Sequence, residues 1–123
     1  MRGELAKREG RGVTALQLKR IAATIPGLDE STSYGTLAFK VKKKLVARMR
    51  EDGDTLVIAM DFVNRDLLMK AEPRVFHLKE HYLDYPYVLV HLDQITPASL
   101  KEHLIDACAR VRRALTNRSP KRR

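Results

Sequence analysis

Apolar residues change their period near residue 36, and this change constrains the fold more than any other feature of the sequence. From that point apolar and polar residues alternate, so that Leu37, Phe39 and Val41 fall on one side of an extended chain. A lysine-rich turn and the segment Asp52-Gly53-Asp54 interrupt the alternation. The alternating runs cover residues 36–42, 45–50 and 55–61. This pattern predicts a three-stranded antiparallel meander.

A helix is predicted on the N-terminal side of the meander. Thr14 is a suitable N-cap for it, and Pro26-Gly27 ends it. Residues 29–33 are then expected to form a loop. The apolar stripe of the helix consists of Leu18, Ile21, Ala22 and Ile25.

Two strands and two helices are predicted after the meander. Asn64 is expected to cap a short helix that turns Leu67, Leu68 and Ala71 inward. Thr96-Pro97 supplies an N-cap followed by a proline at the first helical position, which marks the start of a long C-terminal helix. The strands are expected at residues 75–78 and 87–92. The stripe of the last helix consists of Leu100, Leu104, Ala107, Cys108, Val111 and Leu115.

The predicted order αβββαββα is typical of an α+β two-layer sandwich, in which helices cover one face of an antiparallel sheet and leave the other open. We expect one domain over residues 13–116, a polar lead-in over 1–12 and a basic tail over 117–123. The inward residues of the meander are Leu37, Phe39, Val41, Leu45, Ala47, Met49, Leu56, Ile58 and Met60. The open face is expected to carry Ala38, Lys40, Lys42, Val46, Arg48, Arg50, Val57, Ala59, Asp61, Tyr87, Leu89 and His91.

Composition narrows the class of protein. The chain has 123 residues, enough for one ordinary core. Cys108 is its only cysteine, so an intramolecular disulfide is impossible and a cysteine-based zinc site is not expected. No apolar run reaches the roughly 20 residues of a membrane span, and the charged N-terminus does not resemble a secretory signal. We therefore expect a cytoplasmic protein without a membrane partner.

The net charge of +9 is distributed unevenly along the chain. Residues 1–50 carry 12 Lys and Arg against 4 Asp and Glu, whereas residues 51–106 carry 5 against 11. Residues 107–123 carry 7 basic residues and no acidic one. Solubility alone does not require such segregation, so the pattern favours a polyanionic partner.

Three stretches of this chain, in this order, resemble the MmcQ/YjbR family. The first is Pro26-Gly27 followed by ESTSYGTLAFKVKKKLVAR at residues 30–48. The second runs from Asp61-Phe62 to Val75-Phe76, and the third runs from His81-Tyr82 through YPYVLV at residues 85–90 into the last helix. The resemblance covers about residues 15–115.

This resemblance implies a frataxin-like or secretion-chaperone-like α+β domain. It also implies DNA binding, as the family's members are usually described, and it supplies no catalytic residues. The chain departs from the family's pattern at its Lys42-Lys43-Lys44 turn, where many relatives place a glycine before a lysine. It also has Val46, Tyr87 and Cys108 at positions where aromatic residues are common in the family.

Basic side chains are the candidate functional residues. Repeated cations along one hairpin are what phosphate recognition requires, because each neutralised phosphate releases counterions, and a β-ribbon can enter the major groove of a duplex. Arg110 has an alternative, an ion pair with Asp106 one helical turn before it. The candidate nucleic-acid ligands are Lys40, Lys42, Lys43, Lys44, Arg48, Arg50, Arg110, Arg112 and Arg113.

Other chemistry has weaker support in the sequence. His77, His81, His91 and His103 lack the spacing of a familiar metal site, so no metal or other cofactor is expected. The segments 30–35 and 81–87 are candidates for a shared pocket, but no nucleophile elbow, phosphate-binding loop or dinucleotide fingerprint accompanies them. The chain is therefore not expected to be an enzyme.

Two functions lead at this point, and an enzyme or small-ligand binder that uses the loops of Tyr34 and His81 is a third possibility. The first is a non-catalytic domain that binds nucleic acid, by expectation duplex DNA, through its phosphates. The alternative is a protein-interaction module, or one that self-associates as a homo-oligomer. It would use the open sheet face, with Val46, Val57, Tyr87 and Leu89 as its contacts.

Overall fold

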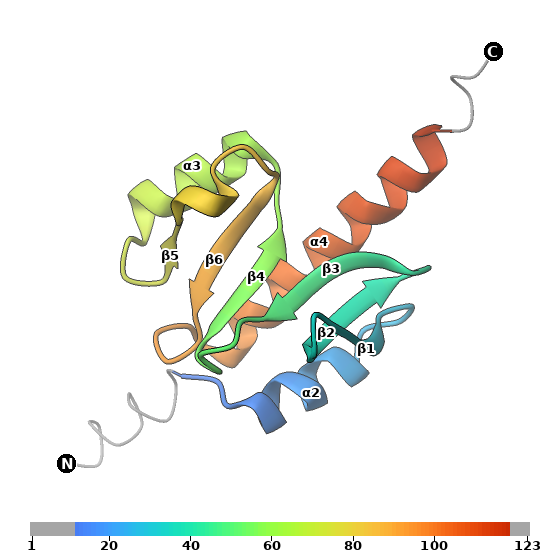
Figure 1. Ribbon diagram of the computed structural model, residues 1–123, viewed down its shortest axis with the longest axis horizontal. Helices are drawn as coiled ribbons and strands as arrows, with labels where there is room; N and C mark the ends of the chain where they lie inside the picture. Colours follow the sequence, from blue (N-terminus) through green and yellow to red (C-terminus); the bar gives the residue numbers. More distant parts are fainter. Residues whose placement is uncertain (1–11, 119–123) are drawn as a thin grey trace.

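The computed structural model of the protein describes residues 12–118, so the polar lead-in and most of the basic tail lie outside the described residues. One sheet with helices against it forms the whole described part (Figure 1). In chain order the elements are α2 (Ala15–Ala23), β1 (Asp29–Ser33), β2 (Thr36–Val41), β3 (Lys44–Met49), β4 (Thr55–Ala59), α3 (Phe62–Ala71), β5 (Phe76–His77), the 3₁₀ turn η1 (Glu80–Tyr82), β6 (Tyr87–His91) and α4 (Pro97–Arg118).

All strand pairs of the sheet are antiparallel, in the spatial order β1-β2-β3-β4-β6-β5. In Figure 1, α4 crosses behind β3 and β4, and α2 lies beside β1 on the same side. The predicted α+β class is thus confirmed. The predicted loop at residues 29–33 is wrong, because this segment is the edge strand β1. Its sequence DESTS shows no apolar alternation, since an exposed edge strand needs none.

The main core lies between the sheet and the helices α2 and α4. Leu18 of α2, Phe39 of β2, Ile58 of β4 and Leu104 of α4 are fully buried there. Val13 joins this core, and its backbone N–H donates to the carbonyl of Leu92 at 2.7 Å. The first described residues are thus already part of the folded domain.

A β-bulge at Val46 changes the predicted faces of β3. Phe39 pairs with Ala47, whereas the next residue, Lys40, pairs with Leu45, so Val46 is an extra residue in the strand. Val46 is therefore buried in the main core, and Leu45 lies on the face that carries Lys40. The sequence prediction had placed these two residues the other way round.

The helix starts are largely as predicted. Thr14 caps α2 in a capping box with Gln17, and the Thr96 hydroxyl accepts a hydrogen bond from the backbone N–H of Ser99 at the start of α4. In α3 the cap is Asp61 rather than Asn64, because the Asp61 carboxylate accepts the backbone N–H of Asn64 at 2.8 Å. The start of α3 is thus three residues earlier than predicted.

The packing of α3 also differs from the prediction. Leu68 and Met69 pack against the main core, whereas Leu67 and Ala71 are exposed. Arg65 is the buried residue of this helix. Among residues 12–118, no helix is long and apolar enough to cross a membrane.

Lys42 and Lys43 form the two-residue turn between β2 and β3 with φ values of 49° and 72°. Two positive φ values are typical of a type I′ turn, which Asn-Gly forms with little strain and a side chain like lysine forms at a cost. The double variant Lys42→Asn/Lys43→Gly is therefore expected to raise the free energy of unfolding by about 1–2 kcal/mol. Urea unfolding followed by circular dichroism measures this change, and an unchanged midpoint would contradict it.

Candidate nucleic-acid interface

One end of the molecule gathers exposed basic side chains from two elements, and we refer to it as the basic end. The turn between β2 and β3 lies beside the last turns of α4, where Lys42 and Arg112 line one hollow with Leu115 and Thr116. The C-terminal part of α4 continues past the sheet in Figure 1. The exposed cations of the basic end are Lys42, Lys43, Lys44, Arg112 and Arg113.

The opposite end of the sheet is acidic. Strand β3 leads from the lysine turn to the turn at residues 51–54, where Glu51, Asp52 and Asp54 are exposed. The loop before α4 adjoins this turn, since the backbone N–H of Leu92 donates to the Asp54 carbonyl at 2.9 Å, and it adds the exposed Asp93. An acidic cluster and a basic cluster therefore lie at opposite ends of β3, whereas other acidic residues lie elsewhere, such as Asp61, which lines a groove with Lys44 and Arg110.

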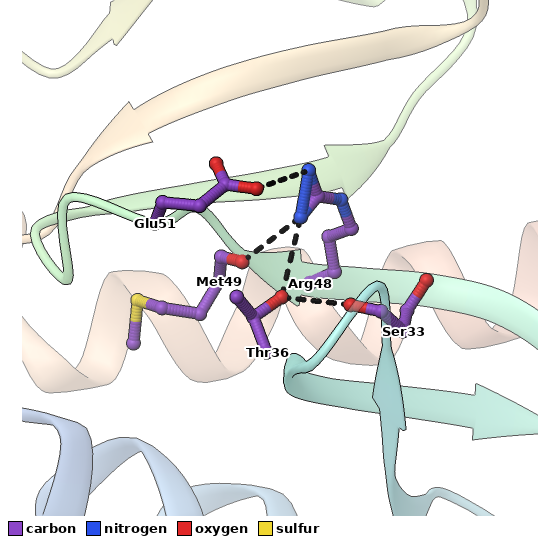
Figure 2. A network of polar contacts seen from close by, with 5 residues as sticks. All are labelled: Ser33, Thr36, Arg48, Met49 and Glu51. Atoms are coloured by element: carbon purple, nitrogen blue, oxygen red, sulfur yellow. Dashed lines mark hydrogen bonds and ion pairs between the residues drawn. The ribbon is translucent and has the colours of Figure 1, made fainter.

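Arg48 does not belong to the exposed cations, although the sequence favoured it as a phosphate ligand. Its side chain is buried, and Nη1 donates to Thr36 Oγ1 and to the Met49 carbonyl, both at 3.2 Å (Figure 2). Nη2 lies 3.8 Å from Glu51 Oε2, and Thr36 Oγ1 in turn donates to the Ser33 carbonyl at 2.9 Å. Arg48 thus ties the turn between β1 and β2 to β3.

Two of the predicted arginines of α4 also have structural partners. Arg110 Nε lies 3.3 Å from Asp61 Oδ2, and its Nη1 donates to the Ala59 carbonyl at 3.1 Å. Asp61, rather than Asp106, is therefore the acidic partner of Arg110. Hydrogen bonds from Asn64, aided by the Arg110 charge, hold the pKa of Asp61 below its usual value. Arg112 remains exposed, but its Nη2 donates to the Pro26 carbonyl at 2.6 Å.

Lys40 and Arg50 lie on the face of the sheet that the helices leave free. Lys40 is partly exposed and pairs with Leu45 in the register of β2 and β3. Arg50 is also partly exposed, and its guanidinium lies 5.8 Å from the centre of the Tyr82 ring. Of the nine predicted ligands, the basic end therefore brings together five, and the other four lie elsewhere or are engaged.

A tyrosine pocket of about 350 Å³ lies on the same face of the sheet. It joins the two segments that the sequence singled out, the loop around Tyr34 and the loop from His81 to Tyr87. The chain contains four tyrosines, and all four line this pocket. Its lining residues are Tyr34, Leu45, Arg48, Val57, His81, Tyr82, Tyr85 and Tyr87.

The floor of the tyrosine pocket shows that part of the predicted open face is covered. Tyr82 packs over Val57 and Leu89, which are 1% and 0% exposed, in a small second core. Tyr82 and Tyr87 meet edge to face with their centroids 6.3 Å apart. Burial raises the pKa of Tyr87 above its ordinary value. Of the apolar contacts that a partner of this face was expected to use, Val57 and Leu89 are thus covered and Val46 lies in the main core, whereas Tyr87 stays partly exposed.

Arg65 holds the loop from His81 to Tyr87 in place, and the sequence contains no indication of this role. The residue is 6% exposed, and its Nη1 donates to the carbonyls of Leu83 at 3.3 Å and Tyr85 at 3.0 Å. Its guanidinium also lies 4.7 Å from the centre of the Phe62 ring. An arginine on a short polar helix carries no sequence signal that separates such an anchor from a solvated side chain.

Comparisons with known proteins support the fold. No protein-family model matches the chain, and no curated protein matches it. Among solved structures, the chain is similar to the Deinococcus radiodurans protein DR2400, whose crystal structure is described as a DUF419 domain. The two are 23% identical, the TM-score is 0.65, and the match covers 80% of this chain and 77% of the other. The likeness shows a shared fold.

Proposed function

We propose that this domain is a non-catalytic nucleic-acid-binding module that contacts the phosphates of duplex DNA with its basic end. The observation that carries the proposal is the turn Lys42-Lys43-Lys44, which presents three adjacent exposed cations at the tip of a hairpin. Two of these lysines stand at positive φ, where Asn or Gly would be less strained. Strain at such a position is often retained for function.

The charge distribution supports the same function. Exposed lysines that neutralise phosphates release counterions, which drives association. The acidic residues Glu51, Asp52, Asp54 and Asp93 lie at the far end of β3, away from the lysine turn. Asp61 lies nearer, in the groove that Lys44 lines, and it is paired with Arg110. Arg112 and Arg113 are weaker evidence, because Arg112 already donates a hydrogen bond to the Pro26 carbonyl that serves the fold. The lysine turn is therefore better evidence for phosphate binding than the two arginines of α4.

The shape of the hairpin tip and the sequence resemblance also support this function. The tip between β2 and β3 is a tight two-residue turn that can approach a groove of DNA between two rows of phosphates, while the strands behind it pair with β1 and β4. The sequence resembles the MmcQ/YjbR family, whose members are usually described as DNA-binding. Nothing in this arrangement selects particular bases, so we expect binding with little sequence preference.

The triple variant Lys42→Ala/Lys43→Ala/Lys44→Ala tests the proposal. It is expected to weaken binding to a short duplex at least tenfold, whatever its sequence, and to lower the slope of log affinity against log salt by about three. Fluorescence anisotropy with a labelled duplex at several salt concentrations measures both quantities.

A matched control is the variant Lys70→Ala/Lys79→Ala/Lys101→Ala, which removes the same charge away from the basic end. It should retain most of the affinity and nearly all of the salt slope. Equal losses in the two triple variants would mean that only net charge matters. If the lysine-turn variant binds normally while removal of residues 119–123 abolishes binding, the tail is the binding element and the proposal is wrong.

A protein-interaction module is the second candidate, and an observation on α3 favours it. Phe62, Val63 and Leu67 expose apolar side chains on this helix. An interaction would therefore involve α3 rather than the sheet face. An elution volume that falls as protein concentration rises, at any salt concentration, would favour this second function over the first.

A further inference from the structure

We infer that the tyrosine pocket holds an unpaired nucleobase next to the phosphates that the lysine turn contacts. This inference rests on the proposed function and names the feature of nucleic acid that the domain would prefer. The ligand would be a nucleic acid with a single-stranded segment beside a duplex.

The composition of the pocket fits a flat ring. Aromatic side chains bind unpaired bases by stacking, without regard to sequence, since every base has two π-faces. The accessible rings of the pocket are those of Tyr34, His81 and Tyr85, with Tyr87 partly exposed, and the buried Tyr82 forms the floor over Val57. A nucleobase also has polar edges, and the phenol hydroxyls and the Arg48 guanidinium supply donors for them.

Neither packing nor the turn conformation requires a tyrosine at position 34. Tyr34 is 88% exposed and stands at φ 53° in the two-residue turn between β1 and β2. Asn would form this turn with less strain and would not expose a large ring. The Arg48 guanidinium lies 5.4 Å from the centre of the Tyr34 ring. Because Arg48 is itself fixed by Thr36, Met49 and Glu51, it holds one face of an otherwise exposed ring.

The tyrosine pocket adjoins a groove that Lys44 of the lysine turn lines. This groove of about 450 Å³, between α4 and the ends of β3, β4 and β6, shares Leu45 and Tyr87 with the tyrosine pocket. Lys44 lines this groove, and it immediately precedes Leu45 in β3. Lys40 is the cross-strand partner of Leu45 on the face of the tyrosine pocket. A strand whose phosphates contact the lysines can therefore place an adjacent base in the pocket.

The charges around the pocket decide what kind of flat ligand it suits. Aromatic cages also bind organic cations, but the Arg48 guanidinium in the wall disfavours a second cation there. Arg50, over the Tyr82 ring, adds a further positive charge nearby. A nucleic acid suits both features, because its flat bases can stack on the aromatic side chains while its negatively charged backbone is attracted to the arginines.

Binding to three DNA duplexes of about a dozen base pairs distinguishes the contribution of an unpaired base to the affinity from that of the phosphates. One is blunt, one carries an overhang of about four thymidines, and one carries an abasic overhang with the same number of phosphates. The chain has no tryptophan, and its four tyrosines all line the pocket, so its intrinsic fluorescence reports on this pocket alone. The thymidine overhang is expected to quench the fluorescence and to bind roughly tenfold more tightly than the abasic one.

The variant Tyr34→Asn/Tyr85→Ser removes two exposed rings, and Asn tolerates the left-handed backbone at position 34. It should bind the two overhangs equally while binding the blunt duplex as the parent does. Leu83→Ser is the matched control, because Leu83 is an exposed apolar residue of the same loop but does not line the pocket. It should keep the preference for thymidine.

The outcomes distinguish this inference from the proposed function. If the parent binds the thymidine and abasic overhangs equally, and the lysine-turn variant binds both more weakly, the base pocket is refuted while phosphate binding stands. If neither the parent nor its lysine-turn variant binds any of the three duplexes, the proposed function fails, and the inference fails with it. Urea unfolding of each variant shows whether a loss of binding reflects a loss of folding.

Discussion

Replacing Arg65 by alanine is expected to lower the free energy of unfolding by about 3–4 kcal/mol and to release the loop that carries three of the four tyrosines. The guanidinium is buried and donates to the carbonyls of Leu83 and Tyr85. Hydrogen bonds from a charged donor contribute about 1.5–3 kcal/mol each at most, and the lost side chain leaves a gap beside Phe62. Because both bonds come from one nitrogen and water can reach the freed carbonyls, we take about 1.5 kcal/mol for each bond and up to about 1 kcal/mol for the gap, which gives the expected range.

The variant Arg65→Met should be milder, with a loss of about 1–2 kcal/mol. Methionine refills much of the volume and removes a buried charge that is imperfectly solvated. Arg65 Nε has no hydrogen-bond partner among the described residues and lies 3.6 Å from Asp66 Oδ1. Because the loop residues are exposed, water can reach the freed carbonyls in either variant.

Chemical unfolding and hydrogen exchange measure the two consequences separately. Exchange of the backbone amides in the segment from His81 to Tyr87 should accelerate in both Arg65 variants, even where the global stability changes little. Arg74→Ala is the control, since Arg74 is an exposed arginine beyond α3 and should change the free energy of unfolding by less than about 0.5 kcal/mol. Arg65 variants that are as stable as the Arg74 variant, with normal exchange in the loop, would show that Arg65 anchors nothing.

The elements that could be predicted from the sequence are those whose own residues carry the signal. Thr14, Thr96-Pro97 and the alternation around Phe39 each specify a cap or a strand by local chemistry. Strand β1 carries no such signal, because its pairing with β2 satisfies its backbone while its side chains face solvent. The bulge at Val46 is likewise invisible, since one extra residue reverses the faces of Leu45 and Val46 without changing the apolar character of either.

The candidate site divides in the same way. The lysine turn could be found from the sequence, because three adjacent lysines in a tight turn have no room to be buried. The engagement of Arg48 and Arg110 could not, since their partners Thr36 and Asp61 are brought to them by the sheet and by the start of α3. A pocket between the Tyr34 and His81 segments could be suggested from the sequence, but its closed floor depends on where Tyr82 packs.

Acid is expected to destabilise the protein well above the pH at which its carboxylates protonate, and His77 is the main cause. Burial, reinforced by the neighbouring His91, lowers the pKa of His77 from its ordinary value of 6.5 to about 4. The two imidazole rings stack with their centroids 3.8 Å apart, and Nδ1 of His77 is buried without a hydrogen-bond partner among the described residues. The folded protein therefore takes up a proton on His77 less readily than the unfolded chain.

The sign of the effect follows from this difference. Above pH 6.5 the His77 imidazole is neutral in both states, so its contribution to stability is fully present. As the pH falls from 6.5 towards 4, the unfolded chain gains the proton first, and stability is lost on the order of 1–2 kcal/mol after allowance for partial exposure. Burial also lowers the pKa of His103, which adds a loss in the same direction.

Carboxylates affect stability at lower pH than the histidines do, so the two effects can be measured separately. The pKa of Asp61 is held below its ordinary value of 3.8 by hydrogen bonds from Asn64. Burial would raise the pKa of Asp52, but hydrogen bonds from Asp54 and Thr55 lower it below 3.8. Stability from these lowered carboxylates is lost only as the pH falls through their folded values. Unfolding measured between about pH 5 and pH 7.5 therefore reports on the histidines.

The variant His77→Phe tests the assignment, because phenylalanine can keep the stack on His91 but cannot take up a proton. Its free energy of unfolding should fall less between pH 7.5 and pH 5 than that of the parent, by about 1–2 kcal/mol. His81→Gln is the control for the loss of one imidazole, since His81 is exposed and lies outside the stack of His77 and His91. A pH dependence that is the same in the His77 variant and the parent would place the acid sensitivity elsewhere. In that case His103, which meets Phe76 edge to face at 5.1 Å in the main core, is the next group to replace.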